Sequence, residues 1–247
     1  MSALQWSLLL GGAAAAANVL GGLVVVARRE WNDLVLKYFL ALGAGFMLAA
    51  GFLSMLPESL RLSSKAPALV LGGYFLVHFF EHTIAPHFHF GEEVHDDLMV
   101  HPAVGFSALV GLSTHTFFDG VSIASGFLVS VPLGLLIFFA VALHKIPEGF
   151  TVASIAIASG RGKRGALMAS GVLAASTLLG VLGMNRFAEA VHWALPISTG
   201  VTIYVAASDL MPEVNSARNI RMPLAVFLGV ALFALCELAL ARLGLVG

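Results

Sequence analysis

Residues 132–159 read PLGLLIFFAVALHKIPEGFTVASIAIAS, an apolar stretch interrupted by the polar segment HKIPEG at 144–149. The stretch exceeds the roughly 20 mostly apolar residues that a helix needs to cross a bilayer. A histidine, a lysine and a glutamate therefore stand near the middle of a predicted membrane span. Ionisable groups at that depth cost about 3 kcal/mol or more each, so their presence indicates a functional site.

The composition of the whole chain is that of a membrane protein. Of its 247 residues, 59% are hydrophobic and 11% are charged, and the mean hydropathy is +0.93. Soluble domains are about 45–50% apolar and about 25% charged. This excludes a disordered chain, a soluble enzyme and a nucleic-acid-binding protein. The sequence has one cysteine, Cys236, which excludes an internal disulfide or a cysteine metal cluster.

We predict an all-α, polytopic membrane protein with a single transmembrane domain over residues 1–247. Eight stretches are long and apolar enough to span a bilayer, and short loops join them. The predicted spans are 4–27, 34–59, 66–84, 102–129, 132–159, 165–184, 191–213 and 221–245.

The loop between the third and fourth spans differs from the others. Residues 85–101 read APHFHFGEEVHDDLMVH, with four histidines among four acidic residues. Such a tract is either a loose, exchangeable metal-binding segment or a polar linker that stays out of lipid. We retain both interpretations.

Basic residues in the short loops predict that both termini lie outside the cell. With that orientation, seven lysines and arginines fall on the cytoplasmic side and four outside. The cytoplasmic set is Arg28, Arg29, Arg161, Lys163, Arg164, Arg218 and Arg221, and the outer set is Arg61, Lys65, Arg186 and Arg242. We therefore expect a multi-pass protein of the plasma or inner membrane.

Two neighbouring spans carry matched polar pairs. The fourth span contains HTFFDG at 115–120 and the fifth contains HKIPEG at 144–149. Residues four apart share a helix face, so His115 with Asp119, and His144 with Glu148, each form one surface. Two imidazoles and two carboxylates at one depth predict a site for a divalent transition-metal ion. The alternative is that each histidine hydrogen-bonds only the acid of its own helix.

Neighbouring residues support a polar path beside these pairs. Pro147 frees the carbonyl of Leu143 and bends the helix axis. Gly120 and Gly149 follow the two acids and permit close helix approach. Lys145 points about 100° away from the histidine before it. It requires an acid partner, for which the acids of the two pairs are candidates, or else it faces a water-filled cavity.

A faint internal repeat is also present. FLSMLPE at 52–58 and ASDLMPE at 207–213 end two spans that run in opposite directions. Inverted repeats are typical of transporters, although two leucine-rich helix ends can also match by chance.

These motifs together resemble the ZIP (Zrt-/Irt-like) divalent metal transporters. HKIPEG and HTFFDG look like the paired motifs of helices 5 and 4 in that family. Residues 43–59, GAGFMLAAGFLSMLPES, and 202–213, TIYVAASDLMPE, also look like ZIP segments. The resemblance implies an inverted repeat of helices 1–3 and 6–8 around helices 4 and 5, and a homodimer. It further implies alternating access, in which a bundle carrying helices 4 and 5 moves against a scaffold.

The resemblance also implies a set of metal ligands, namely Met47, His115, Asp119, His144 and Glu148. Many ZIP proteins hold a second metal with an asparagine in helix 4, a polar or acidic residue in helix 5 and a glutamate in helix 6. Thr116 and Lys145 stand at the first two of these positions, and Thr177 or Ser176 falls near the third. The implied site is therefore mononuclear, with Lys145 in place of the second ion.

The implied function is transport of a divalent transition metal toward the cytoplasm, without enzymatic activity or a resident cofactor. Zinc is the expected cargo, with iron, manganese and cadmium as alternatives. The metal ion, the lipid bilayer and a second copy of the chain are the expected partners. Candidate pathway residues are Thr116, Asp209, His78, His82 and Glu81.

Two other functions remain open from the sequence. His78 to His82 match the H-x-x-E-H pattern of some zinc proteases, which would make the protein an intramembrane zinc hydrolase. The His/carboxylate pairs would alternatively act as proton relays in a carrier of another solute. Asn18 is interpreted as a packing hydrogen bond, and Glu237 as facing a dimer interface or a cavity.

Overall fold

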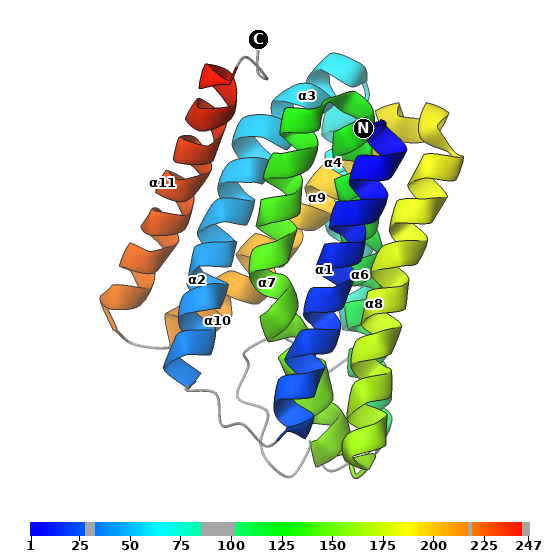
Figure 1. Cartoon of the computed structure of the whole chain (residues 1–247), viewed down its shortest axis with the longest axis vertical. Helices are drawn as coiled ribbons and strands as arrows, with labels where there is room; N and C mark the ends of the chain where they lie inside the picture. The colour runs from blue at the N-terminus through cyan, green and yellow to red at the C-terminus, as the bar shows by residue number, and fades with distance from the viewer. Residues whose placement is uncertain (28–32, 85–101, 217–218, 244–247) are drawn as a thin grey trace.

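The structure, a computed structural model, describes residues 1–27, 33–84, 102–216 and 219–243. All regular secondary structure in these ranges is helical (Figure 1). The all-α prediction is thereby confirmed. The histidine-rich tract predicted at 85–101 lies outside the described residues.

Eight long helices account for most of the described chain. They are α1 (Ala3–Val26), α2 (Asp33–Ala49), α4 (Ala66–Phe79), α6 (Pro102–Val129), α7 (Val131–Ala158), α8 (Gly162–Arg186), α9 (Val191–Tyr204) and α11 (Arg221–Arg242). Shorter segments extend some of these helices or connect them. They are η1 (Ala50–Met55), α3 (Leu56–Leu62), η2 (Phe80–Ile84), η3 (Ala188–Ala190), η4 (Val205–Leu210) and α10 (Met211–Ser216).

Six stretches among the described residues are long and apolar enough to cross a membrane. They are Ala3–Val26, Leu34–Leu62, Val131–Ala158, Gly162–Arg186, Ala188–Ser216 and Arg221–Arg242. The predicted spans 66–84 and 102–129 are helical, as α4 with η2 and as α6, but are not among the six. Both helices contain histidine and acidic residues, which lower their mean hydropathy. The count of eight spans therefore stays a prediction.

The two ends of the sequence echo adopt the same local structure. η1 leads directly into α3, and η4 leads directly into α10; both η segments are π-helical. Pro57 and Pro212 each stand at the second position of the short helix that follows. A proline has no N–H and clashes with the carbonyl four residues earlier. A wider turn just before the proline accommodates that clash without ending the helix.

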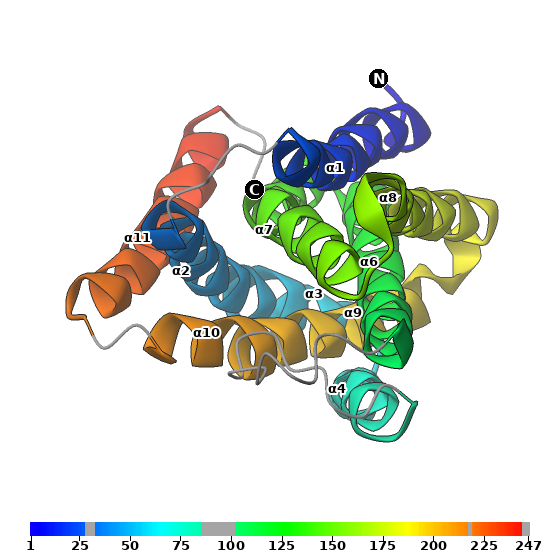
Figure 2. The same cartoon turned by 90° about the horizontal axis from the view of Figure 1, so that it is seen from below.

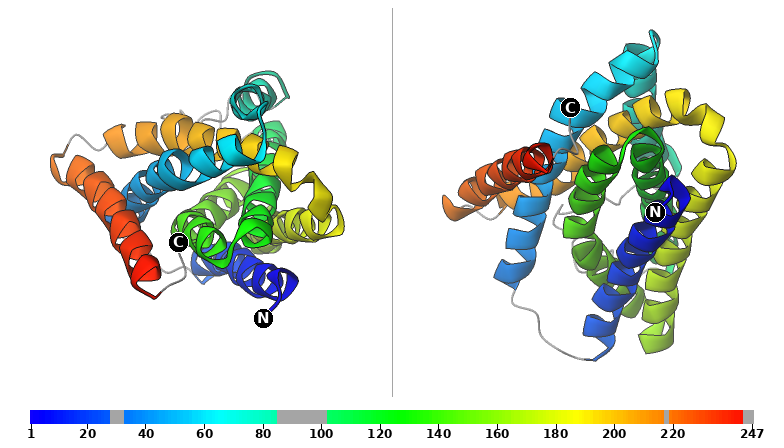
Figure 3. Two further views of the ribbon diagram at one scale, coloured as in Figure 1. Left: turned by 90° about the horizontal axis from the view of Figure 1, so that it is seen from above. Right: turned by 45° about the horizontal axis from the view of Figure 1, so that its top comes forward.

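The long helices pack as two groups. α1, α6, α7 and α8 contact one another, whereas α2 packs on α11 and α4 packs on α9. The views along the bundle in Figures 2 and 3 show both groups side by side. Contacts of α2 with α7 and of α6 with α9 join them. The core cluster around Met47, Ala140 and Tyr204 lies where the groups meet.

Glycines allow the closest helix contacts in the first group. A Cβ at Gly149 would collide with the backbone carbonyl of Asn18 in α1, and one at Gly120 would collide with that of Thr177 in α8. The expectation that both glycines permit close approach is confirmed. The main chains of α6 and α7 are therefore fixed directly against neighbours at the level of the two acids.

α1 begins and α11 ends at the same end of the bundle (Figure 1). Three of the seven basic residues predicted to be cytoplasmic, at positions 28, 29 and 218, lie outside the described residues. Of the eleven loop residues counted in the prediction, eight are described, four from each predicted side. They are Arg161, Lys163, Arg164 and Arg221 at one end, and Arg61, Lys65, Arg186 and Arg242 at the other. The orientation of the termini stays a prediction.

Candidate metal centre

The centre is built on the hairpin of α6 and α7. Ser130 alone separates the two helices, and its side chain accepts a hydrogen bond from the amide of Leu133 in the first turn of α7. His115 lies 15 residues before this turn, and His144 lies 14 residues after it. At about 1.5 Å per residue, each histidine is roughly 20 Å from the turn. The two imidazoles therefore stand at one depth.

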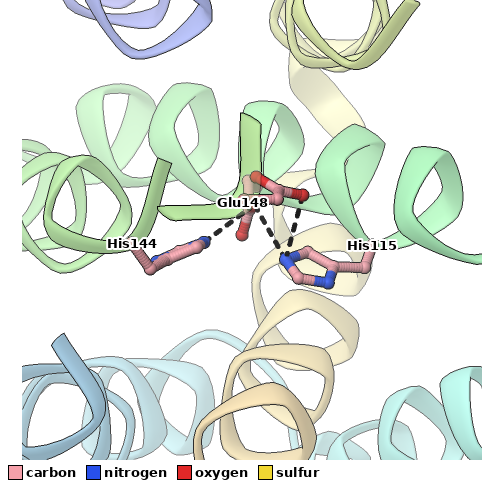
Figure 4. A group of neighbouring side chains, drawn as sticks. His115, His144 and Glu148 are labelled. Carbon is pink, nitrogen blue, oxygen red and sulfur yellow. Dashed lines mark hydrogen bonds and ion pairs between the residues drawn. The ribbon is translucent and has the colours of Figure 1, made fainter. Parts of the chain in front are cut away.

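Four side chains from this hairpin converge in the protein interior. One ligand atom from each of His115, Asp119, His144 and Glu148 lies within 4.8 Å of the others. In Figure 4 the rings of His144 and His115 approach from opposite sides, with Glu148 between them. Each of the four residues is at most 3% exposed. Two imidazole nitrogens and two carboxylates at this spacing form a donor set suited to a first-row transition metal.

Contacts between imidazoles and carboxylates in the centre cross from one helix to the other. Nε2 of His144 lies 3.3 Å from Oδ2 of Asp119, and Nε2 of His115 lies 3.4 Å from the same oxygen. Nε2 of His115 is also 3.7 Å from Oε1 of Glu148. The alternative in which each histidine pairs only with the acid of its own helix is therefore wrong. Nε2 of His115 is buried and makes no well-aligned hydrogen bond, which leaves it available to a ligand.

Lys145 lies against both of its candidate acid partners. Its Nζ is 2.6 Å from Oδ2 of Asp119 and 2.6 Å from Oε2 of Glu148. It also donates to the hydroxyl of Thr116 at 3.4 Å, and that hydroxyl donates to Oε1 of Glu148. Lys145 and Thr116 are fully buried. With neutral histidines, two carboxylates and one ammonium leave a net charge of -1, so the buried centre favours an additional cation.

Comparison with known proteins agrees with this geometry. A sequence model described as ZIP zinc transporter matches residues 87–237, which is more than half of the chain. The chain belongs to the ZIP family. The resemblance found in the sequence is confirmed, and the chain is a multi-pass membrane protein.

Several curated ZIP proteins are similar to parts of the chain. The zinc transporter ZIP13 homolog of Drosophila melanogaster is 32% identical over 141 residues, covering 53% of this chain and 40% of that protein. Zinc transporter ZIP13 of Danio rerio is 30% identical over 146 residues, covering 55% and 42%. Human zinc transporter ZIP4 is 30% identical over 115 residues, covering 45% and 18%. The chain therefore spans less than half the length of each of these relatives.

Met47, the sulfur ligand implied by the ZIP resemblance, is fully buried in α2. It stands one helical turn after Gly43. A Cβ at Gly43 would lie 3.7 Å from Cβ of His144, so α2 and α7 are in contact there. Because residues four apart share a helix face, Met47 lies on the face of α2 turned toward α7.

In many ZIP proteins the sixth span, here α8, provides a glutamate to a second metal. In this chain two hydroxyl residues of α8 fall near that position, and their hydrogen bonds go to the main chain. Ser176 donates to the carbonyl of Ser113 at 2.7 Å, and Thr177 donates to the carbonyl of Leu173 at 3.3 Å. Neither side chain offers a carboxylate to a second ion. The ammonium of Lys145 is the additional positive charge next to the two acids of the centre.

Two other pathway candidates, both acids, are buried outside the centre. Asp209 in η4 is 5% exposed. Glu81 is buried at the start of η2 and hydrogen-bonds the hydroxyl of Tyr204. Buried acids are therefore present in both η2 and η4, and the acid of η2 bonds a hydroxyl of α9.

The H-x-x-E-H residues at the junction of α4 and η2 do not form a comparable centre. His78 and His82 are exposed with ring centroids 4.1 Å apart, whereas Glu81 is buried. Among the residues that the structure describes, the group able to hold a metal is the one in α6 and α7.

Asn18 is the site residue that sequence reasoning missed, since it had been interpreted as a packing contact. It is fully buried in α1. Its amide faces two acceptors, the carbonyl oxygen of Lys145 and Oε2 of Glu148, so the nitrogen belongs on that side. In this orientation it donates to them at 2.7 and 3.1 Å. Its distance along the sequence from the two motifs left no pattern that would have revealed this contact.

Glu237 of α11 faces a cavity, which was one of its two expected surroundings. The cavity has a volume of about 430 Å³ and is also lined by Glu58 and Arg61 of α3 and by Ser130 of the hairpin turn. Glu58 and Arg61 form an ion pair at 3.2 Å. The cavity therefore brings charged groups of α3 and α11 next to the turn between α6 and α7.

Proposed function

We propose that the protein carries divalent transition-metal ions, zinc foremost, across a membrane. The observation that carries this proposal is the convergence of four metal-binding atoms from two buried helices in a chain of the ZIP family. A buried donor set with an excess negative charge binds a cation that is otherwise excluded from the bilayer. No resident cofactor takes part, because the metal is the cargo.

The donor types favour zinc and its neighbours in the periodic table. Imidazole nitrogens select first-row transition metals over magnesium and calcium, which prefer oxygen ligands alone. The curated relatives are named zinc transporters, and zinc is therefore the first cargo to test. Iron, manganese and cadmium fit the same ligands.

One ion occupies the centre at a time. The ammonium of Lys145 lies between Asp119 and Glu148, where it takes the place of a second metal ion. The hydroxyls at the helix 6 position bond the main chain instead of facing a metal. The ammonium of Lys145 repels an arriving metal ion from its own side of the two acids. The ion therefore binds on the side of the acids where the two imidazoles also reach it.

The full ligand set comprises His115, Asp119, His144 and Glu148, with Met47 as a thioether ligand from α2. Thr116 orients Glu148 through its hydroxyl. Beyond the centre, the candidate pathway residues are Asp209, Glu81, His78 and His82. The buried position of the two acids and the exposure of both histidines support a route from the centre to the end of η2.

Transport proceeds by alternating access between the two helix groups. Four of the five proposed ligands, the imidazoles and carboxylates, belong to the group of α1, α6, α7 and α8, so movement of that group against the other would carry the ion with it. The packing also supports an inverted repeat, because α1 packs on α7 as α8 packs on α6, and α2 packs on α11 as α9 packs on α4. With the eight long helices counted in order, exchanging the first three with the last three, and the fourth with the fifth, converts one packing pair into the other.

We place this transporter domain in the plasma or inner membrane as eight spans, with both termini outside and the cytoplasm as the destination of the metal. An inside-negative potential would favour that direction by about 2.3 kcal/mol per charge per 100 mV. A homodimer is the expected assembly, and the mass of the purified protein in detergent tests it.

The proposal is tested by zinc uptake into proteoliposomes. We expect the native protein to take up zinc and His144→Ala and Glu148→Ala to lose most of the uptake, because each removes a ligand from the buried centre. Asn185→Ala is the matched control, since it removes a partly buried amide contact between α8 and α1 away from the centre. Elemental analysis of the purified native protein should give one zinc per chain in the transport path.

Several outcomes would overturn the proposal. Unchanged uptake in both ligand variants would exclude the centre, and two ions in the path would exclude the single-ion arrangement. A protein that binds no zinc but moves an organic solute would be a carrier of another kind. Peptide cleavage that depends on Glu81 would favour the hydrolase, against which the names of the relatives, all transporters, already count.

A further inference from the structure

Asn18 is a fully buried amide in the middle of a helix without charged residues. A buried amide costs free energy unless its polar atoms find partners. The partners of the Asn18 amide belong to α7, at the metal centre itself. They are the carbonyl of Lys145, 2.7 Å away, and Oε2 of Glu148, 3.1 Å away.

We infer that Asn18 is a positioning residue, which holds the carboxylate of Glu148 in its metal-binding orientation when an arriving ion pushes the ammonium of Lys145 away from that carboxylate. This inference rests on the proposed function. Before metal arrives, Oε1 of Glu148 accepts from Thr116, and Oε2 accepts from both Lys145 and Asn18. The carboxylate is thus held from three sides.

The three donors respond differently to a cation. The ammonium of Lys145 is repelled by a divalent ion and must move away from at least one carboxylate. The amide of Asn18 and the hydroxyl of Thr116 are neutral, so a metal ion does not repel them in this way. Asn18 is therefore the donor that stays on Oε2 while the ion binds the remaining lone pairs of Glu148.

The main chain keeps Asn18 in this place. Gly149 directly follows Glu148, and its Cα packs against the backbone carbonyl of Asn18 so closely that a Cβ would not fit. One turn further along α1, Gly21 approaches the carbonyl of Ile146 in the same way. The two close contacts fix α1 on α7, so the amide meets Glu148 without any need for a long, mobile side chain.

The expected effect is a loss of metal affinity. Groups that orient a metal ligand typically contribute 10–100-fold in affinity. We expect Asn18→Ala to raise the KM for zinc uptake, and the Kd for zinc in detergent, by roughly 10–100-fold. The maximal rate should be retained, because the substitution removes none of the proposed ligands and zinc is saturating.

Asn185→Ala is the matched control. The side-chain amide nitrogen of Asn185 donates to the hydroxyl of Ser7 in α1 at 2.9 Å. Asn185 therefore also links α1 to a neighbouring helix, but it does so away from Glu148 and the centre. A merely structural role for Asn18 would lower the melting temperature and the yield of active protein in both variants and leave KM unchanged. Asn18→Leu, which keeps the volume of the side chain and removes both donors, is the second variant in case the smaller residue does not fold.

The measurements separate this inference from the proposed function. If the native protein and Asn185→Ala neither bind nor move zinc, the proposed function itself fails. If both do so and the two Asn18 variants match them in KM and Kd, Asn18 has no positioning role. A raised KM with a retained maximal rate, in either Asn18 variant but not in the control, supports the inference.

Discussion

At the scale of single residues, the centre is a balance of buried charges. Asp119 and Glu148 lie in contact with one ammonium, that of Lys145, and with the imidazoles of two histidines. All of these groups are withdrawn from solvent. Removing one partner of a buried ion pair leaves an uncompensated charge, which is far more costly than the pair itself is favourable. The stability of the metal-free protein should therefore depend on Lys145.

Lys145→Met should destabilise the zinc-free protein by about 3–5 kcal/mol, because two carboxylates lose their nearest cation. Zinc should restore much of this stability, since the ion replaces the missing charge. Thermal unfolding in detergent, with a chelator and then with excess zinc, measures both effects. Lys163→Met, at an exposed position at the start of α8, is the control. Equal melting of native protein and Lys145→Met in the chelator would contradict this account of the lysine.

At the scale of the helix, small residues decide where the acids can stand. Gly120 and Gly149 each follow an acid of the centre, and each packs against a main-chain carbonyl of a neighbouring helix. A methyl group at either position has no room, and the obstacle is backbone rather than a flexible side chain. Helix propensity alone would favour alanine at both positions, so the glycines reflect packing.

Gly149→Ala and Gly120→Ala should each destabilise the protein by about 1–3 kcal/mol, because α1 or α8 must shift away from the hairpin. Gly171→Ala provides the comparison, since it is also within a long helix but a Cβ there would meet no atom within 4 Å. Unfolding of the three purified variants in detergent, with uptake measured alongside, provides the check. A loss in Gly171→Ala as large as in the other two would show that the close contacts are unimportant.

At the scale of the whole molecule, the two helix groups meet along α2 with α7 and α6 with α9. The candidate metal centre lies in one group, and Met47, the proposed sulfur ligand, lies in the other. A carrier that moves one group against the other must break and reform contacts at this boundary. Contacts inside either group have no such requirement.

A disulfide across the boundary should therefore stop transport. Cβ atoms at Gly43 and Leu143 lie 3.5 Å apart, which suits a disulfide between α2 and α7. In a Cys236→Ser background, oxidation of Gly43→Cys/Leu143→Cys should abolish zinc uptake, and reduction should restore it.

A pair within one group is the control for this crosslink. Cβ atoms at Gly11 of α1 and Val181 of α8 lie 3.6 Å apart. The oxidised Gly11→Cys/Val181→Cys protein should transport as well as its reduced form. Full uptake with the boundary pair oxidised would argue against movement between the groups.

The sequence by itself determined the class of protein and the chemistry of the centre. Composition specified a helical membrane protein, because so much apolar surface cannot be buried in a soluble chain of this size. The spacing of four residues in HTFFDG and HKIPEG placed one imidazole and one acid on each helix face. Those results depend on local periodicity, which a single sequence records directly.

Only the tertiary structure decided which groups meet. Asp119 pairs with the histidine of the other helix, Lys145 bridges both acids, and Asn18 reaches Glu148 from a helix more than a hundred residues away in sequence. These contacts depend on the angle and distance at which helices pack, and small residues such as Gly149 set that distance. Periodicity within one helix carries no information about its neighbour, so the partners of the buried charges follow from packing alone.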